Sequence, residues 1–123
     1  MTTENITVLV VDDDPETVRI FEYFLQKQGY IAIIAGTVAE AIDRMQDIRP
    51  DMILLDLMLP NENGTELLKT IRTTPGYEDI HVIIISAHAI EDQHLPTDIR
   101  PDTILRKPIR IPALADAIRD ALS

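Results

Sequence analysis

The feature that most constrains the fold of this chain is a set of short apolar runs that end abruptly in polar or charged residues. The first run, Val8–Val11, is followed directly by three aspartates, Asp12, Asp13 and Asp14. The other runs, with the residues that end them, are Met52–Leu55 with Asp56, His81–Ile85 with Ser86, and Thr103–Arg106 with Lys107 and Pro108. Runs of this length and composition are typical of strands buried on both faces of a sheet. Polar residues at their carboxyl ends predict an open α/β sheet with a functional site along that edge.

Helical patterns separate the predicted strands. Asp14 followed by Pro15 predicts a helix start, and Gly29 predicts its end. The buried stripe of this helix is predicted to contain Val18, Phe21 and Leu25, widened by Ile20 and Phe24. The later expected elements are a strand over 30–35, a helix opened by the capping box Thr37–Glu40 and closed by Pro50, a strand over 52–56, a loop over 57–64, a helix carrying Leu67, Leu68 and Ile71, a short helix over Ile90–Leu95, and a last helix from Pro112.

This alternation of strands and helices predicts a single α/β domain over residues 1–123. Right-handed crossovers place helices on both faces of a parallel sheet. Five strands fit the flavodoxin-like, doubly wound order 2-1-3-4-5, in which the switch point lies between strands one and three. Asp12, Asp13 and Asp56 are expected to meet at that crevice. A hydrophobic fraction of 46% is sufficient to build the core of such a domain.

Composition excludes several classes of function. The formal net charge is −10, from 11 basic and 21 acidic residues, which argues against direct binding of nucleic acid. The chain contains no cysteine, so neither disulfides nor thiolate chemistry are available. The first residues do not resemble a signal peptide, and no apolar run is long enough to cross a membrane. We therefore expect a cytoplasmic location and no membrane partner.

The predicted cluster of carboxylates suits a hard cation such as Mg²⁺, which prefers oxygen ligands. Asp12, Asp13 and Asp56 carry three negative charges, which Mg²⁺ together with Lys107 would balance. A phosphoryl group entering this site brings about two further negative charges, and the metal, the lysine and the Ser86 hydroxyl could hold its oxygens. The pattern therefore favours phosphoryl transfer with Asp56 as the nucleophile.

These residues resemble the receiver domains of two-component response regulators, in particular the single-domain chemotaxis type. The resemblance covers essentially the whole chain and rests on five motifs in order: Val10–Asp14, Leu54–Pro60, Asn63–Gly64, Ile84–Ala87 and Lys107–Pro108. It implies a signalling module that catalyses only its own phosphorylation and dephosphorylation, and is otherwise not an enzyme. A sensor histidine kinase or a phosphotransfer protein would supply the phosphoryl group, and a downstream effector protein would read the result.

The resemblance also implies a role for each matching residue. Asp56 would accept the phosphoryl group from phosphohistidine, and Lys107 would contact its oxygens. The Mg²⁺ ligands would be Asp13, Asp56 and the backbone carbonyl of Met58, with Asp12 acting mainly through a bound water. Ser86 would move inward to hydrogen-bond the phosphoryl group, the small Ala87 would leave the acyl phosphate open to water, and the Lys107–Pro108 bond would be cis. Asp14 falls outside the core pattern and is expected to cap a helix.

Two departures from the family pattern concern the transmission of the signal. Receivers usually carry Tyr or Phe three residues before the lysine, whereas this chain has Ile104. The usual Gly-Ala-Asp before the fifth strand is replaced by Ile99–Asp102, and the proline-containing stretch after Ile90 is unlike the usual fourth helix. We expect phosphorylation chemistry to be retained. We expect output through the face around the fourth helix and the fifth strand to be altered.

Two alternatives to a phosphorylation-controlled module remain open. The first is a receiver-shaped interaction domain that no longer switches, which Ile104 motivates. The second is a Mg²⁺-dependent phosphohydrolase, although such enzymes usually have a second acid two residues after the nucleophile, where this chain has Met58. The sequence also leaves open whether the domain forms a homodimer.

Overall fold

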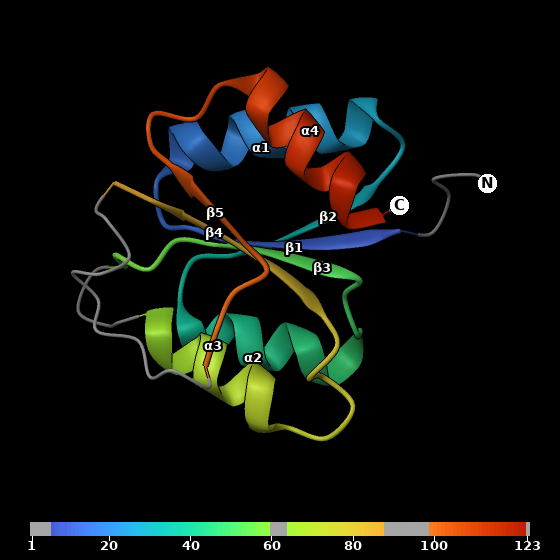
Figure 1. Ribbon diagram of the computed structural model, residues 1–123, viewed down its shortest axis with the longest axis vertical. Coiled ribbons are helices and arrows are strands. Elements are labelled where there is room, and N and C mark those ends of the chain that lie inside the picture. The colour runs from blue at the N-terminus through green and yellow to red at the C-terminus, as the bar shows by residue number, and fades with distance from the viewer. Residues whose placement is uncertain (1–5, 60–63, 88–98, 123) are drawn as a thin grey trace.

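The computed structural model describes residues 6–59, 64–87 and 99–122. It contains five strands and four helices within these ranges (Figure 1). The strands are β1 (Thr7–Val11), β2 (Ile31–Ala35), β3 (Met52–Leu55), β4 (His81–Ser86) and β5 (Thr103–Arg106), and the helices are α1 (Pro15–Lys27), α2 (Val38–Asp47), α3 (Gly64–Thr73) and α4 (Ile111–Leu122). None of these helices is both long enough and apolar enough to span a membrane.

The five strands form one sheet in the order β2-β1-β3-β4-β5, and every pair is parallel. Strand β1 therefore lies between β2 and β3, with Val11 opposite Ala35 on one side and Leu55 on the other. This arrangement confirms the predicted flavodoxin-like fold, whose switch point lies between β1 and β3.

Helices cover both faces of the sheet, with α1 and α4 on one side and α2 and α3 on the other (Figure 1). Alternate residues of a strand point to opposite faces, so β1 contributes to two cores. Val8 and Val10 pack in the core under α1 and α4, whereas Leu9 and Val11 pack in the core under α2 and α3. All four side chains are at most 1% exposed, which explains why this run is continuously apolar rather than alternating.

The predicted element boundaries agree with the structure to within one residue for the strands, and the last helix begins at Ile111, one residue before the predicted Pro112. Asp14 caps α1 as predicted, since its side chain accepts hydrogen bonds from the Glu16 N–H and the Thr17 hydroxyl. The short helix expected over Ile90–Leu95 lies outside the described residues.

Two details of the predicted helices were wrong. The sequence predicts Ile20 in the buried stripe of α1, but Ile20 is 48% exposed, because the residues facing the sheet on this helix are Phe21 and Leu25. The capping box of α2 is only half formed. Thr37 accepts from the Glu40 N–H as expected, but the Glu40 carboxylate accepts from Gly36 rather than from Thr37.

Candidate functional site

The site is built where the carboxyl ends of the strands meet at one edge of the sheet. Backbone hydrogen bonds continue the sheet pattern one residue past β1, β3 and β5. The Asp12 N–H donates to the Ala35 carbonyl, the Asp56 N–H to the Val11 carbonyl, and the Lys107 N–H to the Ser86 carbonyl, at 3.1, 2.9 and 2.9 Å. These bonds hold the polar residues that follow the strands in a fixed register, so residues distant in the sequence converge.

Three carboxylates converge at this edge as predicted. Asp12, Asp13 and Asp56 can each offer one oxygen such that all three oxygens lie within 4.8 Å of one another. Asp12 and Asp56 are buried, at 3% and 6% exposure, whereas Asp13 is exposed. All three metal-ligand atoms would be carboxylate oxygens, and Asp13 is open to solvent. The cluster therefore suits a hard divalent cation that retains part of its water shell.

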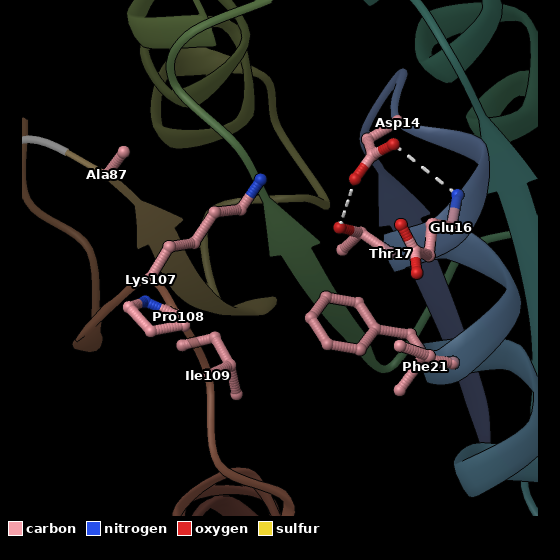
Figure 2. Close-up of a pocket in the computed structure, with 9 residues that line it drawn as sticks. Asp14, Glu16, Thr17, Phe21, Ala87, Lys107, Pro108 and Ile109 are labelled. Carbon is pink, nitrogen blue, oxygen red and sulfur yellow. Dashed lines mark hydrogen bonds between the residues drawn. The ribbon is translucent and has the colours of Figure 1, made fainter.

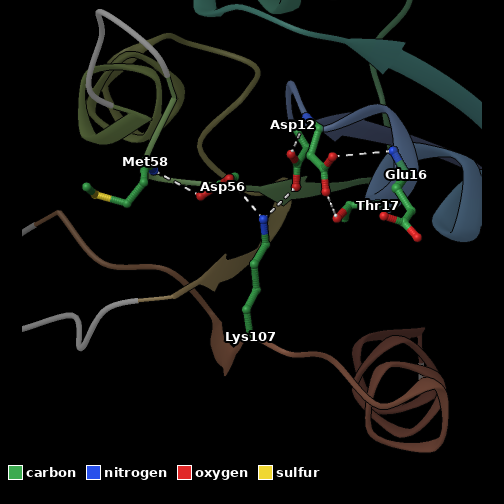
Figure 3. Close-up of polar contacts among 7 residues, drawn as sticks. Asp12, Glu16, Thr17, Asp56, Met58 and Lys107 are labelled. Atoms are coloured by element: carbon green, nitrogen blue, oxygen red, sulfur yellow. Dashed lines mark hydrogen bonds and ion pairs between the residues drawn. The ribbon is translucent and has the colours of Figure 1, made fainter.

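Lys107 lies between the two buried carboxylates. Its Nζ is 3.1 Å from Asp12 Oδ2 and 3.1 Å from Asp56 Oδ2 (Figure 3). Burial alone lowers the pKa of Lys107, but the hydrogen bonds to Asp12 and Asp56 raise it more, so the pKa lies above its usual value of 10.5. Lys107 is therefore a permanent cation that partly compensates the acidic cluster. The Lys107–Pro108 bond is cis, which confirms the expectation from the sequence.

Backbone N–H groups bind the remaining oxygens of the two buried carboxylates. The Met58 N–H donates to Asp56 Oδ1 at 2.9 Å, and the Asp14 N–H donates to Asp12 Oδ1 at 3.0 Å. Burial nevertheless raises the pKa of Asp12 above its usual value of 3.8, although the Asp14 N–H and Lys107 oppose this. Burial thus disfavours the ionised form of Asp12, and a bound cation would favour it.

Ser86 and Asp14 occupy different positions relative to the cluster. Ser86 ends β4, between β3 and β5, and is 2% exposed. The movement of Ser86 toward Asp56 remains a prediction, as does metal binding by the Met58 carbonyl. Asp14 lies outside the carboxylate cluster, and the hydrogen bond from the Thr17 hydroxyl lowers its pKa.

Gly64, the first residue of α3, packs directly against the backbone that carries the central aspartate. A Cβ atom at this position would lie 2.7 Å from the Asp56 carbonyl oxygen and 2.9 Å from the Leu57 Cα. The Gly64 N–H also donates to the Leu57 carbonyl at 3.0 Å. The absence of a side chain therefore lets α3 support the loop after β3. The sequence predicts a loop through Gly64, whereas the structure begins α3 at this residue. The contact with the Asp56 backbone depends on tertiary packing, so the sequence pattern does not predict it.

We expect Gly64→Ala to destabilise the fold by about 1–3 kcal/mol, since the two nearest atoms that the new methyl group meets belong to the backbone and must move. The displaced loop should also weaken Mg²⁺ binding. Chemical denaturation and Mg²⁺ titration test this. Gly36→Ala is the matched control, because its Cβ would meet only the end of the Glu40 side chain, at 3.4 Å. Equal stability of the two variants would contradict the proposed packing role.

A groove of about 450 Å³ opens beside Lys107, between α1 and the β5–α4 connection. Figure 2 shows Pro108 and Ile109 facing Phe21 across this groove. It shares Ile20 with a second groove of about 420 Å³. The second groove is lined by Arg19, Ile20, Tyr23, Phe24, Lys27 and Ile111. The two grooves together form an apolar surface that begins at the acidic site. We call it the α1 surface. Sequence periodicity missed this surface because it assigned Ile20 to the core.

Comparisons with known proteins agree on one family. The family model for the response regulator receiver domain matches residues 8–119. The chain is 28% identical to the polar-differentiation response regulator DivK of Brucella anthropi, covering 94% of this chain and 95% of DivK. It is 29% identical to the DNA-binding response regulator MtrA of Mycolicibacterium smegmatis, covering 99% of this chain but only 53% of MtrA.

The structure comparison leads to the same fold. A CheY-like response regulator receiver domain protein from Methanospirillum hungatei superposes with a TM-score of 0.85 at 27% identity, covering 97% of this chain and 94% of that one. The chain thus spans nearly all of DivK and of this structure, but about half the length of MtrA.

Proposed function

Because this chain belongs to the response regulator receiver domain family of two-component systems, we propose that it accepts a phosphoryl group on Asp56 from a phosphohistidine. The observation that carries this proposal is the position of Asp56. Asp56 is 6% exposed, and its carboxylate has an oxygen within 4.8 Å of oxygens of two other carboxylates and contacts the ammonium group of Lys107. Receivers are signalling modules rather than conventional enzymes, so we propose that the modified form acts by changing its contacts with an effector protein in the cytoplasm.

In the proposed transfer, a carboxylate oxygen of Asp56 forms a bond to phosphorus while the bond from phosphorus to the imidazole nitrogen breaks. The imidazole leaves with the electron pair of that bond, so no redox partner is required. Two groups already contact Asp56: the Met58 N–H at Oδ1 and Lys107 Nζ at Oδ2. They orient the nucleophile before the donor arrives, and Lys107 also supplies positive charge for the phosphoryl oxygens.

The carboxylates of Asp12, Asp13 and Asp56 fit a magnesium ion by donor type and by spacing. When bound, Mg²⁺ would supply the positive charge that the three carboxylates and the incoming phosphoryl group require. Lys107 alone leaves this cluster with a surplus of negative charge, so its own residues support a requirement for a divalent ion. Ser86 is proposed to hydrogen-bond a phosphoryl oxygen, and Ala87 leaves the mouth of the site open to water.

A protein donor must rest its surface on the residues around the mouth of the site, and the α1 surface is adjacent to it. Ile20 and Tyr23 are exposed at 48% and 64% and line the same groove, and contiguous exposed apolar surface of this kind marks interaction sites. Arg19 and Lys27 flank them in a chain whose net charge is −10. We therefore propose that the phosphohistidine-bearing protein docks on this surface and presents apolar residues flanked by carboxylates.

We expect Ile20→Glu to slow phosphoryl transfer from a protein donor by about tenfold or more, because it places a charge where apolar surface is buried. The measurement uses the fastest donor from a panel of phosphorylated histidine kinases. Modification by acetyl phosphate should be unchanged, since a small donor needs no docking surface. Equal slowing with both donors would contradict the docking role and would point to damage at the acidic site.

The proposed phosphorylation is tested by incubating the protein with acetyl phosphate, with and without Mg²⁺. Intact-protein mass spectrometry should show addition of a single phosphoryl group only when Mg²⁺ is present. Hydroxylamine should remove this group, because it cleaves acyl phosphates. Modification that is independent of Mg²⁺ or resistant to hydroxylamine would contradict the proposed site chemistry.

A second candidate function is an interaction domain that does not switch. It is supported by Ile104, which replaces the usual aromatic residue, lies on β5 opposite Ile84 and is 41% exposed. In this case beryllofluoride with Mg²⁺ would perturb NMR signals only around Asp56. Large shifts extending through Ser86 into β5 would reject this candidate and favour a conventional switch.

A further inference from the structure

Met58 is an exposed methionine at the rim of the phosphoacceptor site. The residue is 48% exposed, whereas Met45 and Met52 are 4% and 0% exposed. Met1 lies outside the described residues, and the chain contains no cysteine. Among the described residues, Met58 is therefore the only sulfur that a solvent oxidant can readily reach.

The position of Met58 connects this exposed sulfur to the proposed function. The residue follows Asp56 by two positions, and its N–H donates to Asp56 Oδ1 at 2.9 Å. Figure 3 shows its side chain extending from the side of Asp56 that lies away from Asp12. A donor imidazole that reaches the buried Asp56 carboxylate brings its own protein surface onto this rim. The Met58 side chain would then be buried against the donor, on the side of the mouth opposite the α1 surface.

A thioether suits such a contact because it is apolar, flexible and polarisable. Oxidation changes this chemistry. The sulfur takes one oxygen atom from hydrogen peroxide and is oxidised by two electrons, while the peroxide is reduced to water. The resulting sulfoxide is polar and chiral, so burying it against an apolar donor surface requires removing its bound water.

We propose that Met58 is an oxidation-sensitive contact for the phosphoryl donor. This inference rests on the proposed function, and it makes phosphoryl transfer from a protein donor slower after exposure to peroxides. Modification by a small donor would be affected less, because the Asp56 carboxylate and Lys107 are not themselves oxidised. The sulfoxide can be reduced enzymatically, so the effect would be reversible.

The first part of the test measures where oxidation occurs. The protein is treated with dilute hydrogen peroxide, digested and analysed by mass spectrometry. We expect Met58 to be oxidised at least about tenfold faster than Met45 and Met52, since oxidation of buried sulfur requires opening of the fold. Similar rates at all three positions would overturn the inference, because the premise of selective access would be false.

The second part compares donors before and after oxidation. Transfer from the fastest kinase of the panel should fall by about tenfold, and by clearly more than phosphorylation by acetyl phosphate. Methionine sulfoxide reductase should restore it. Met58→Leu is the control, because leucine cannot be oxidised in this way. For this variant, the ratio of the rate of phosphorylation by the kinase to the rate of phosphorylation by acetyl phosphate should not change on peroxide treatment, whatever its starting value.

The outcomes separate the two proposals. An unchanged kinase rate after complete oxidation of Met58, or equal losses with both donors, overturns this inference while leaving the proposed function intact. If the untreated wild-type protein accepts no phosphoryl group from any donor, the proposed function is wrong and the inference fails with it. The oxidation rates of the three methionines are measured in either case.

Discussion

Replacing Asp56 with asparagine is expected to abolish phosphorylation of this protein by both acetyl phosphate and phosphorylated kinases. An amide oxygen is a far weaker nucleophile than a carboxylate, so phosphoryl incorporation should fall to background, a loss of at least about a hundredfold. The fold should persist. The amide oxygen can still accept a hydrogen bond, and Lys107 retains Asp12 as an ionic partner at 3.1 Å. Because the substitution removes one of three carboxylates that repel one another, we expect the variant to be at least as stable as the wild type.

The measurement is intact-protein mass spectrometry after incubation with Mg²⁺ and acetyl phosphate. Asp43→Asn is a matched control, since Asp43 lies on the exposed face of α2 and the same chemical change occurs far from the sheet edge. The control should be modified at the wild-type rate. A stably folded Asp56→Asn variant that still gains a phosphoryl group would show that another residue is the acceptor.

The strand ends could be predicted from the sequence because strands buried on both faces consist of unbroken apolar runs. In such a run the first polar residue marks the carboxyl end. Parallel strands share that end, so Asp12, Asp56 and Lys107 lie along one edge of the sheet, and the strand order makes Asp12 and Asp56 neighbours. Residues separated by up to 95 positions can therefore be assigned to one edge of the sheet from the sequence.

Side-chain exposure at the borders of helices could not be predicted in the same way. Ile20 lies at the edge of the apolar stripe of α1, and periodicity cannot tell whether a neighbouring element covers it. In the structure, the groove beside the β5–α4 connection leaves it open. The contact of Gly64 with the Asp56 backbone could not be predicted from the sequence pattern either, because it depends on how α3 packs against the loop after β3. Local patterns therefore predict the acidic centre of the site, while its supports and its rim depend on long-range packing.

Replacing Lys107 with methionine is expected to change metal binding and phosphorylation in opposite directions. Removal of the ammonium group leaves the carboxylates of Asp12 and Asp56 without their shared cation. The cluster then attracts Mg²⁺ more strongly, and we expect its affinity to rise by about tenfold. Phosphorylation by acetyl phosphate should instead fall by about a hundredfold, because the variant lacks the cation proposed to bind the phosphoryl oxygens.

The same substitution should lower the free energy of unfolding of the metal-free protein by about 1–3 kcal/mol at neutral pH, because two buried carboxylates lose a charged hydrogen-bond donor. This loss of unfolding free energy depends on pH. The pKa of Asp12 is raised in the folded wild type, chiefly by burial, and loss of Lys107 raises it further. A folded state that binds protons more tightly than the unfolded chain loses stability as the pH rises from 3.8 through the folded pKa. The variant should therefore approach wild-type stability at acidic pH and fall below it as the pH increases.

Lys107→Arg provides the control, since it keeps the positive charge but not the geometry of a single ammonium nitrogen between two carboxylates. It should preserve the Mg²⁺ affinity and most of the stability of the wild type while still slowing phosphorylation. Mg²⁺ titration by calorimetry and denaturation across pH measure these quantities separately. If Lys107→Met bound Mg²⁺ no more tightly than the wild type, the ammonium group and the metal would not be sharing the charge of one cluster. The electrostatic basis of the proposed function would then be wrong.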